Sequence, residues 1–198
     1  MSGLAPASAA VGPRRSRARG WWGIALFVVT EGTLFGTIFG TYFYLRLKST
    51  HWPPAGIPEP RVVVPAILTA VLLTTSIPMQ LASAAGTAGR ARRAQLSLLT
   101  ALVVQAGYLA MQLHLYVDDV RDYPPRLHAY ASITHLMVGA DHFHVLVGLL
   151  LNVFLVAKLT DGRVTAYRLT GLQAGVFYWH FVNVLTLLVL GVQLSARL

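Results

Sequence analysis

Five long apolar stretches restrict how this chain can fold more than any other feature of its sequence. They cover about residues 21–45, 62–85, 95–116, 130–157 and 170–195. A helix needs about 20 mostly apolar residues to cross the hydrocarbon core of a bilayer, and each stretch meets that length. Only 12% of the 198 residues are charged, about half the fraction found in soluble domains, whose surface must face water. The sequence therefore predicts an all-α integral membrane bundle of five transmembrane helices.

The connections between these stretches contain residues that stop helices. The first carries two prolines followed shortly by a glycine, and the third carries three aspartates and two prolines; the four breaks are residues 51–56, 86–93, 118–126 and 160–163. Prolines and glycines of this kind mark turns. Inside the second stretch, Pro78 removes a backbone donor, so we expect a kink in that helix.

A cluster of arginines precedes the first stretch, as it does in a signal peptide. A signal peptide has an apolar region of about 7–15 residues that ends at small residues, whereas this run continues from residue 21 to about residue 45. We therefore expect an uncleaved first helix. Residues 1–19, rich in Ala, Gly, Pro and Arg, are predicted to form a disordered basic cytoplasmic tail, and residues 20–198 form the transmembrane domain.

The basic residues indicate the orientation of the bundle. With the N-terminus in the cytoplasm, ten of the sixteen Lys and Arg residues fall on the cytoplasmic side and six on the other. Positive charge favours cytoplasmic loops, so this asymmetry predicts a cytoplasmic N-terminus and a C-terminus outside. The formal net charge of +9 is thus explained by membrane topology, and no nucleic-acid partner is expected.

Two acids and several histidines lie inside the predicted spans. Glu31 is ten residues into the first stretch and Asp141 eleven into the fourth, which places both roughly 15 Å deep. His180 is near the middle of the fifth stretch, and His144 follows Asp141. An ionisable group at this depth indicates a functional site. For Glu31 the alternative is a protonated carboxyl that serves packing alone; we expect it to be buried against another helix, near His144 or His180.

No active site is apparent in this chain. Asp141 and His144 have the i, i+3 spacing that places two ligands on one helix face, and Glu31 and His180 could join them around a metal. Two acids in the spans are few for a membrane metal centre, so we expect no metal. The chain lacks cysteine, a nucleophile motif with a base in reach, and a glycine-rich phosphate loop, so no catalytic residue and no bound cofactor are expected.

Five motifs, in order along residues 21–185, resemble subunit III of haem–copper cytochrome oxidases. Residues 178–184 read Tyr-Trp-His-Phe-Val-Asn-Val, similar to the family's Tyr-Trp-His-Phe-Val-Asp-Val, and residues 52–57 read Trp-Pro-Pro-Ala-Gly-Ile, similar to Trp-Pro-Pro-x-Gly-Ile. The first stretch matches in Glu31 and in the residues that follow it. The fourth stretch matches in two places. The first is Tyr130, Ala131 and Ser132, and the second is His144, Val145 and Gly148.

The resemblance implies a function without redox chemistry in this chain. It implies the short five-helix form of the family, a subunit of a respiratory terminal oxidase in the bacterial cytoplasmic membrane. Such a subunit stabilises catalytic subunit I, which carries the haem and copper, and contacts the other oxidase subunits. Family members hold phospholipids in a cleft, so membrane lipid is a candidate ligand, and the acid matched by Glu31 is linked to that cleft and to proton uptake.

The candidate site residues fall into two sets. Glu31, Asp141, His144 and His180 are assigned to a lipid cleft or to a proton-related role. The resemblance gives a second set of partner-contact or motif residues: Trp52, Pro53, Pro54, Trp179 and Asn183.

Three departures from the family pattern leave alternatives open. Asp141 replaces the first histidine of a His-x-x-His motif, Asn183 replaces an aspartate, and the glutamate that ends the third span is absent. One alternative is a five-helix relative associated with nitric oxide reductase or another respiratory complex. A stand-alone proton-coupled transporter is less favoured. Such proteins often show inverted repeats and discontinuous helices at corresponding positions, and neither is apparent in this sequence.

Overall fold

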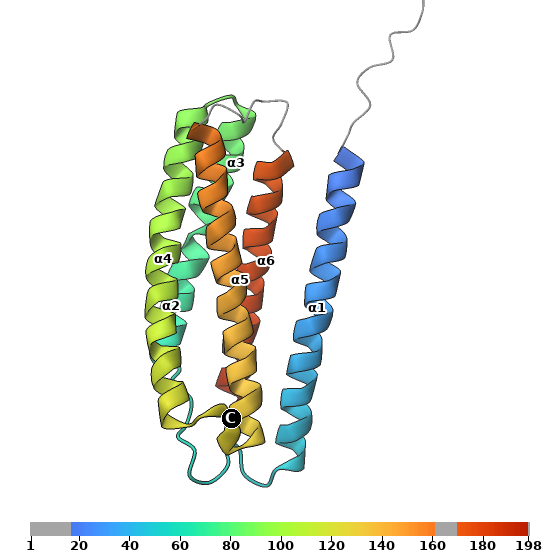
Figure 1. The fold of residues 1–198 in the computed structure, drawn as a ribbon, viewed down its shortest axis with the longest axis vertical. Coiled ribbons are helices and arrows are strands. Elements are labelled where there is room, and N and C mark those ends of the chain that lie inside the picture. The colour runs from blue at the N-terminus through green and yellow to red at the C-terminus, as the bar shows by residue number, and fades with distance from the viewer. Residues whose placement is uncertain (1–16, 161–169, 198) are drawn as a thin grey trace, which may run out of the picture.

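The computed structural model describes residues 17–160 and 170–197, which form a bundle of nearly parallel and antiparallel helices (Figure 1). Four spans are single helices: α1 (Arg17–Lys48), α4 (Ala91–Asp122), α5 (Ala129–Thr160) and α6 (Thr170–Ser195). The remaining span consists of α2 (Val63–Thr74) and α3 (Ser76–Thr87), and a short 3₁₀ turn, η1 (Pro125–Leu127), precedes α5. Five helices long and apolar enough to cross a membrane confirm the predicted fold class in the described residues.

Most predicted helix ends lie within a few residues of the observed ones, with two exceptions. Helix α1 begins at Arg17, so residues 17–19 are helical although the sequence assigned them to the tail; residues 1–16 lie outside the described part. Helix α4 continues to Asp122, six residues beyond the predicted end. The last turn of α4 is held from outside the helix, because Arg61 lies 3.6 Å from Asp119 and 3.1 Å from Asp122. The predicted break at 160–163 is described only at Thr160, the last residue of α5.

The predicted kink in the second span is a break between α2 and α3 at Thr75. Pro78 has no N–H, so the carbonyl four residues earlier cannot receive a helical hydrogen bond from it. The chain tightens just before this point: the Thr75 N–H donates to the Leu72 carbonyl at 3.0 Å, an i→i−3 bond. The Thr75 hydroxyl donates to the same carbonyl at 2.5 Å. The break places a polar hydroxyl in the interior of the bundle.

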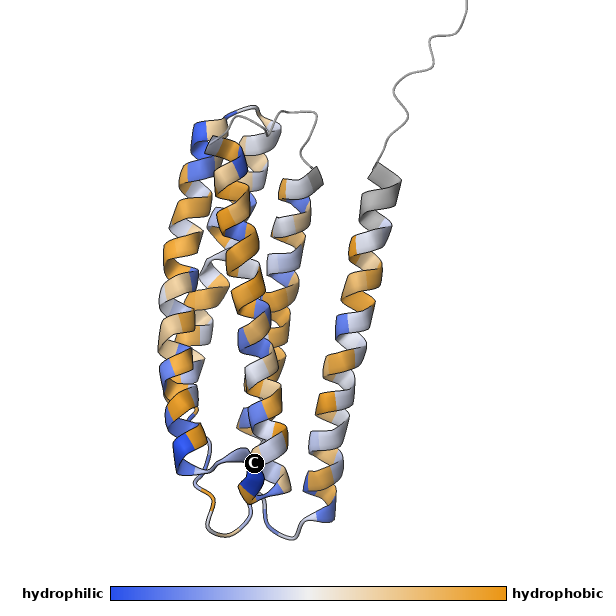
Figure 2. Ribbon diagram, in the orientation of Figure 1, coloured by the Kyte–Doolittle hydropathy of each residue, from blue (hydrophilic) through white to orange (hydrophobic). Residues whose placement is uncertain are grey.

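The helices divide into a compact group and one outlying member. Helix α4 packs against α3 and α5, and α6 packs against α5 and the α2–α3 span, whereas α1 lies at one side against α5 and α6. Figure 1 shows α1 diverging from α6 toward the end of the bundle where the chain begins. Hydrophobic residues cover most of the length of the helices (Figure 2), as expected for surfaces that face lipid.

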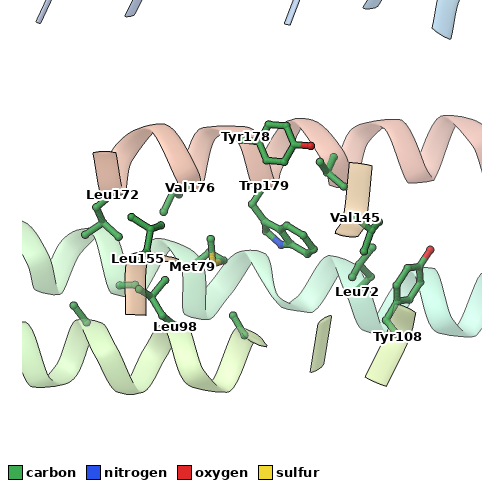
Figure 3. Close-up of a cluster of buried hydrophobic side chains, with 14 of the residues drawn as sticks. Leu72, Met79, Leu98, Tyr108, Val145, Leu155, Leu172, Val176, Tyr178 and Trp179 are labelled. Atoms are coloured by element: carbon green, nitrogen blue, oxygen red, sulfur yellow. The ribbon is translucent and has the colours of Figure 1, made fainter. Parts of the chain in front are cut away.

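The largest buried cluster is centred on Trp179 of α6. In Figure 3 its ring points from α6 toward α2 and α3, between Leu72 and Met79. The indole Nε1–H donates to the Thr75 hydroxyl at 2.7 Å. On the other side of the ring, Gly148 of α5 leaves no room for a side chain, because an added Cβ would lie 2.7 Å from two atoms of the indole.

Candidate functional site

Glu31 and His144 form a hydrogen-bonded pair in the middle of the bundle. Glu31 comes from α1 and His144 from α5, and the Glu31 carboxylate oxygen Oε2 lies 2.8 Å from the His144 Nε2. The imidazole is 7% exposed and the carboxylate side chain 20% exposed. The contact joins the outlying helix to the compact group at mid-depth, where a lone ionisable group is unfavourable unless it is paired.

The second ring nitrogen of His144 fixes how many protons the pair holds. Its Nδ1 lies 2.7 Å from the Ala140 carbonyl oxygen, which can only accept, so Nδ1 carries a hydrogen. The contact between Nε2 and the carboxyl oxygen of Glu31 then needs one further proton, either on the acid or on the ring. The pair is electrically neutral in both arrangements, and it can exchange a proton between two atoms without a change in net charge.

Aromatic side chains surround this pair. The Phe35 ring meets the His144 ring edge-on with 5.2 Å between centroids. Tyr178 of α6 donates its hydroxyl hydrogen to the His144 carbonyl at 3.0 Å, and its ring lies 5.8 Å from that of Phe27. These contacts hold α1, α5 and α6 together around the pair and limit the access of water to it.

The other two acidic or basic candidates lie elsewhere. Asp141 is buried, 2% exposed, and its Oδ1 accepts a 2.8 Å hydrogen bond from the Thr186 hydroxyl of α6. His180 lies between α6 and α3, with its Nε2 3.4 Å from the Gln80 side-chain oxygen. Among the described residues no three His, Asp or Glu side chains are grouped so that they could hold a metal ion.

A cavity of about 540 Å³ lies between α1, α5 and α6 in the half of the bundle where α1 begins. Its walls are almost entirely apolar, and one cation, Lys158, lies in the last turn of α5. The inner end lies about one helical turn from the Glu31–His144 pair, since Phe27 precedes Glu31 by one turn and Tyr178 contacts His144. The other lining residues include Gly23, Ile24, Val147, Leu151, Phe154, Gly171 and Gly175.

The motif residues hold helices and loops together. Trp52 donates its indole hydrogen to the Tyr42 hydroxyl at 3.0 Å and packs edge-on against Tyr130 of α5, which anchors the first connection to two helices. The Pro54 carbonyl accepts from the Ile57 N–H at 3.1 Å in the following turn, and Pro53 is half-buried beside it.

Two residues of α6 face the break between α2 and α3. Trp179 binds Thr75, and the Asn183 amide donates to the Ser76 hydroxyl at 2.7 Å. Thr75 and Ser76 were not predicted as partners of these residues. Their position could have indicated this role, because they lie three and two residues before Pro78, where a broken helix leaves polar groups that need hydrogen-bond partners.

In the described residues, five helices long and apolar enough to cross a membrane define a multi-pass membrane protein. The profile of the family described as cytochrome c oxidase subunit III matches residues 16–194 of this chain. Cytochrome c oxidase subunit 3 of Thermostichus vulcanus is 28% identical over 164 residues, which cover 82% of this chain and 80% of the relative.

Other relatives carry the same description. The subunit 3 of Synechocystis sp. is 27% identical over 168 residues, 82% of this chain and 70% of the relative. That of Rhizopus stolonifer is 32% identical over 176 residues, 83% of this chain and 60% of the relative. The chain belongs to the cytochrome c oxidase subunit III family. Its function is accordingly that of a subunit III in a haem–copper oxidase complex of the respiratory chain.

Proposed function

We propose that this chain stabilises the haem- and copper-bearing catalytic subunit I of a bacterial oxidase, holds a phospholipid beside α1, and supports proton uptake through Glu31 and His144. The observation that carries the proposal is the 2.8 Å contact between these two side chains, about one helical turn from the inner end of an apolar cavity. The relatives described above are all subunits of cytochrome c oxidases, which supports an oxidase rather than a nitric oxide reductase.

The dimensions and chemistry of the cavity support a lipid. A volume of about 540 Å³ lies within the range of about 300–1,000 Å³ typical of sites for small molecules. Apolar walls suit an acyl chain. Lys158 lies in the last turn of α5, near the predicted cytoplasmic surface, where a cation attracts an anionic phosphate.

Association with a catalytic subunit can be tested by purification. The tagged chain, extracted from native bacterial membranes in mild detergent, should carry with it a larger haem- and copper-containing membrane subunit. The same chain purified alone should show no haem absorbance. Stoichiometric iron or copper in the isolated chain, or purification from native membranes without any haem protein, would contradict the proposal.

Lipid binding can be tested by filling the cavity. Gly171 lines it, and no atom lies within 4 Å of a Cβ added there, so the Phe side chain of a Gly171→Phe variant has room to enter. We expect this variant to lose phospholipid that co-purifies with the wild-type complex, as counted by native mass spectrometry. The matched control is Gly191→Phe, on the exposed side of the same helix and equally open. Equal lipid content in both variants would contradict the assignment.

A further inference from the structure

A second pocket, unrelated to the lipid cavity, enters the bundle at the opposite end. Its mouth lies among Arg61 in the first connection, Asp119 at the end of α4 and Gln193 near the end of α6. Its inner end is formed by Asp141 and Thr186. Gln193 and Thr186 are two helical turns apart, so the pocket extends about 10 Å into the bundle along α6.

Polar side chains follow the wall of this pocket on α4. Tyr108, Gln112, Tyr116 and Asp119 all line it, and their spacing of four, four and three residues places them along one face of the helix. The Gln112 amide donates to the Tyr108 hydroxyl at 3.2 Å. A continuous polar stripe inside a membrane bundle is unfavourable in contact with lipid, and it is expected where water lines the helix.

The inner end contains polar atoms whose hydrogen bonds are incomplete. His142 is 5% exposed and lines the pocket, and its Nδ1 has no hydrogen-bond partner among the described residues. The Thr186 hydroxyl lies within hydrogen-bond distance of both the Asp141 carboxylate, at 2.8 Å, and the Val182 carbonyl, at 3.1 Å. When Asp141 is ionised, the one hydrogen of this hydroxyl cannot fully serve both acceptors. Buried polar atoms of this kind are usually satisfied by internal water.

The pocket has room for that water. Its volume is about 40 Å³, and a buried site needs about 10–15 Å³ by this measure to hold one water molecule. Two or three molecules therefore fit between the mouth and Asp141, and the polar walls supply the partners that each molecule needs.

We propose that this pocket is a hydrated proton-exchange site, in which ordered water carries protons between the C-terminal surface of the bundle and the carboxyl of Asp141. In the exchange step a hydronium O–H bond breaks, a carboxyl O–H bond forms on Asp141, and a water molecule remains; no electron transfer is involved. Neither Glu31 nor His144 lines this pocket, although His144 is one helical turn from Asp141 on α5 and close enough to act on its carboxyl electrostatically.

The charged and titratable groups around the route come from several parts of the chain. Arg61 lies at the mouth beside Asp119, at 3.6 Å. The other titratable groups are Tyr108 and Tyr116 of α4, Tyr123 just after it, and His142 of α5. His144 of α5 and Tyr178 of α6 do not line the pocket, but both interact electrostatically with Asp141. From α6 the pocket receives Thr186 and Gln193, which do not titrate. Asp141 is thus the innermost carboxyl of the route, and Asp119 is its carboxyl at the surface.

The test follows the carboxyl of Asp141 by infrared spectroscopy of the full chain in lipid nanodiscs. The carbonyl stretch of a protonated carboxyl shifts when its proton is replaced by deuterium, and Asp141→Asn identifies the band. Isotopic labelling of aspartate separates this band from that of Glu31 if the Asn variant does not fold. After transfer into D₂O, we expect the Asp141 band to shift within minutes.

A bulky substitution that blocks the mouth of the pocket provides the second part of the test. Gln193→Phe places an apolar ring at the entrance, and we expect it to slow the deuterium shift by about tenfold or more. Gln173→Phe is the matched control: Gln173 is a half-buried glutamine at the other end of α6, outside this pocket. A band that stays unshifted for hours, the absence of a protonated Asp141 band across the pH range in which the chain stays folded, or equal exchange in both Phe variants would overturn the proposal. None of these outcomes depends on the lipid cavity or on Glu31.

Discussion

Because Glu31 is hydrogen-bonded to His144, replacing the acid with Gln and with Ala should affect the complex differently. In Glu31→Gln the side-chain amide can still donate to the His144 Nε2, because the Nδ1 hydrogen is directed to Ala140. We expect the complex to assemble with a wild-type initial rate of turnover, and to lose activity faster during sustained turnover because no proton can be exchanged. Oxygen consumption measured over many turnovers checks this, with Glu59→Gln, an exposed acid in the first connection, as control.

Glu31→Ala should behave differently. It leaves the largely buried His144 Nε2 without its partner, a loss that costs about 1–3 kcal/mol for a buried polar group. We expect lower thermal stability and reduced assembly for the Ala variant alone. If the Gln variant keeps wild-type activity through prolonged turnover, Glu31 has a structural role and the proton role proposed for the pair is wrong.

The sequence predicted that Glu31 lies near His144 or His180, and the contact with His144 confirms this, but the sequence did not decide between the two histidines or indicate the partner of Asp141. Hydropathy gives the position of a residue along its helix, so Glu31, Asp141, His144 and His180 were all placed near mid-depth. The rotation of each helix about its axis decides the rest: it directs His144 to α1, Asp141 to Thr186 and His180 to Gln80. That rotation depends on contacts between helices that are far apart in the sequence, which a local pattern does not contain.

At the scale of the helices, the contact between α5 and α6 depends on the absence of a side chain at Gly148. In Gly148→Ala the new Cβ would lie 2.7 Å from two ring atoms of Trp179, and the rigid indole is held by Thr75 on its far side. Overpacking of this kind typically costs about 1–3 kcal/mol. We expect the Gly148→Ala variant to unfold at a lower temperature than the wild-type chain when both are measured in nanodiscs.

Gly36 supplies the comparison for this substitution. It lies on the exposed side of α1 with no atom within 4 Å of an added Cβ, and alanine is favoured over glycine inside a helix by about 0.5–1 kcal/mol. Gly36→Ala should therefore leave stability unchanged or slightly higher. If Gly148→Ala and Gly36→Ala lose the same amount of stability, the close approach of Trp179 to Gly148 does not limit the packing of α5 against α6.

Helix existence was predicted more accurately than helix ends, for a physical reason. The apolar stretches are long enough to identify all five spans. The extension of α4 to Asp122 was missed because Arg61, from another connection, holds its last turn. Pro78 did indicate a disruption of the second span, but the separation into α2 and α3 depends on a hydroxyl at Thr75 that can bind both its own helix and Trp179.

At the scale of the whole molecule, the orientation in the membrane is the prediction to test. The ten-to-six distribution of basic residues favours a cytoplasmic N-terminus. The chain contains no cysteine, so single cysteines can be labelled without background. We expect a membrane-impermeant maleimide to label Arg126→Cys, in η1, on intact spheroplasts. Arg92→Cys, in the first turn of α4, should be labelled only after the membrane is opened. The reverse pattern would invert the topology and the side from which the Asp141 pocket opens.

The neutrality of the Glu31–His144 pair also determines how it responds to the membrane potential. Moving one charge across a bilayer at 100 mV changes its energy by about 2.3 kcal/mol, over a hydrocarbon thickness of about 30 Å. The pair spans 2.8 Å between its two atoms, so even a bond aligned with the field would gain only about 0.2 kcal/mol. This bond runs between neighbouring helices that both cross the membrane, which reduces the effect further. A respiring membrane therefore leaves the position of this proton almost unbiased by voltage, and the groups in contact with the pair decide it.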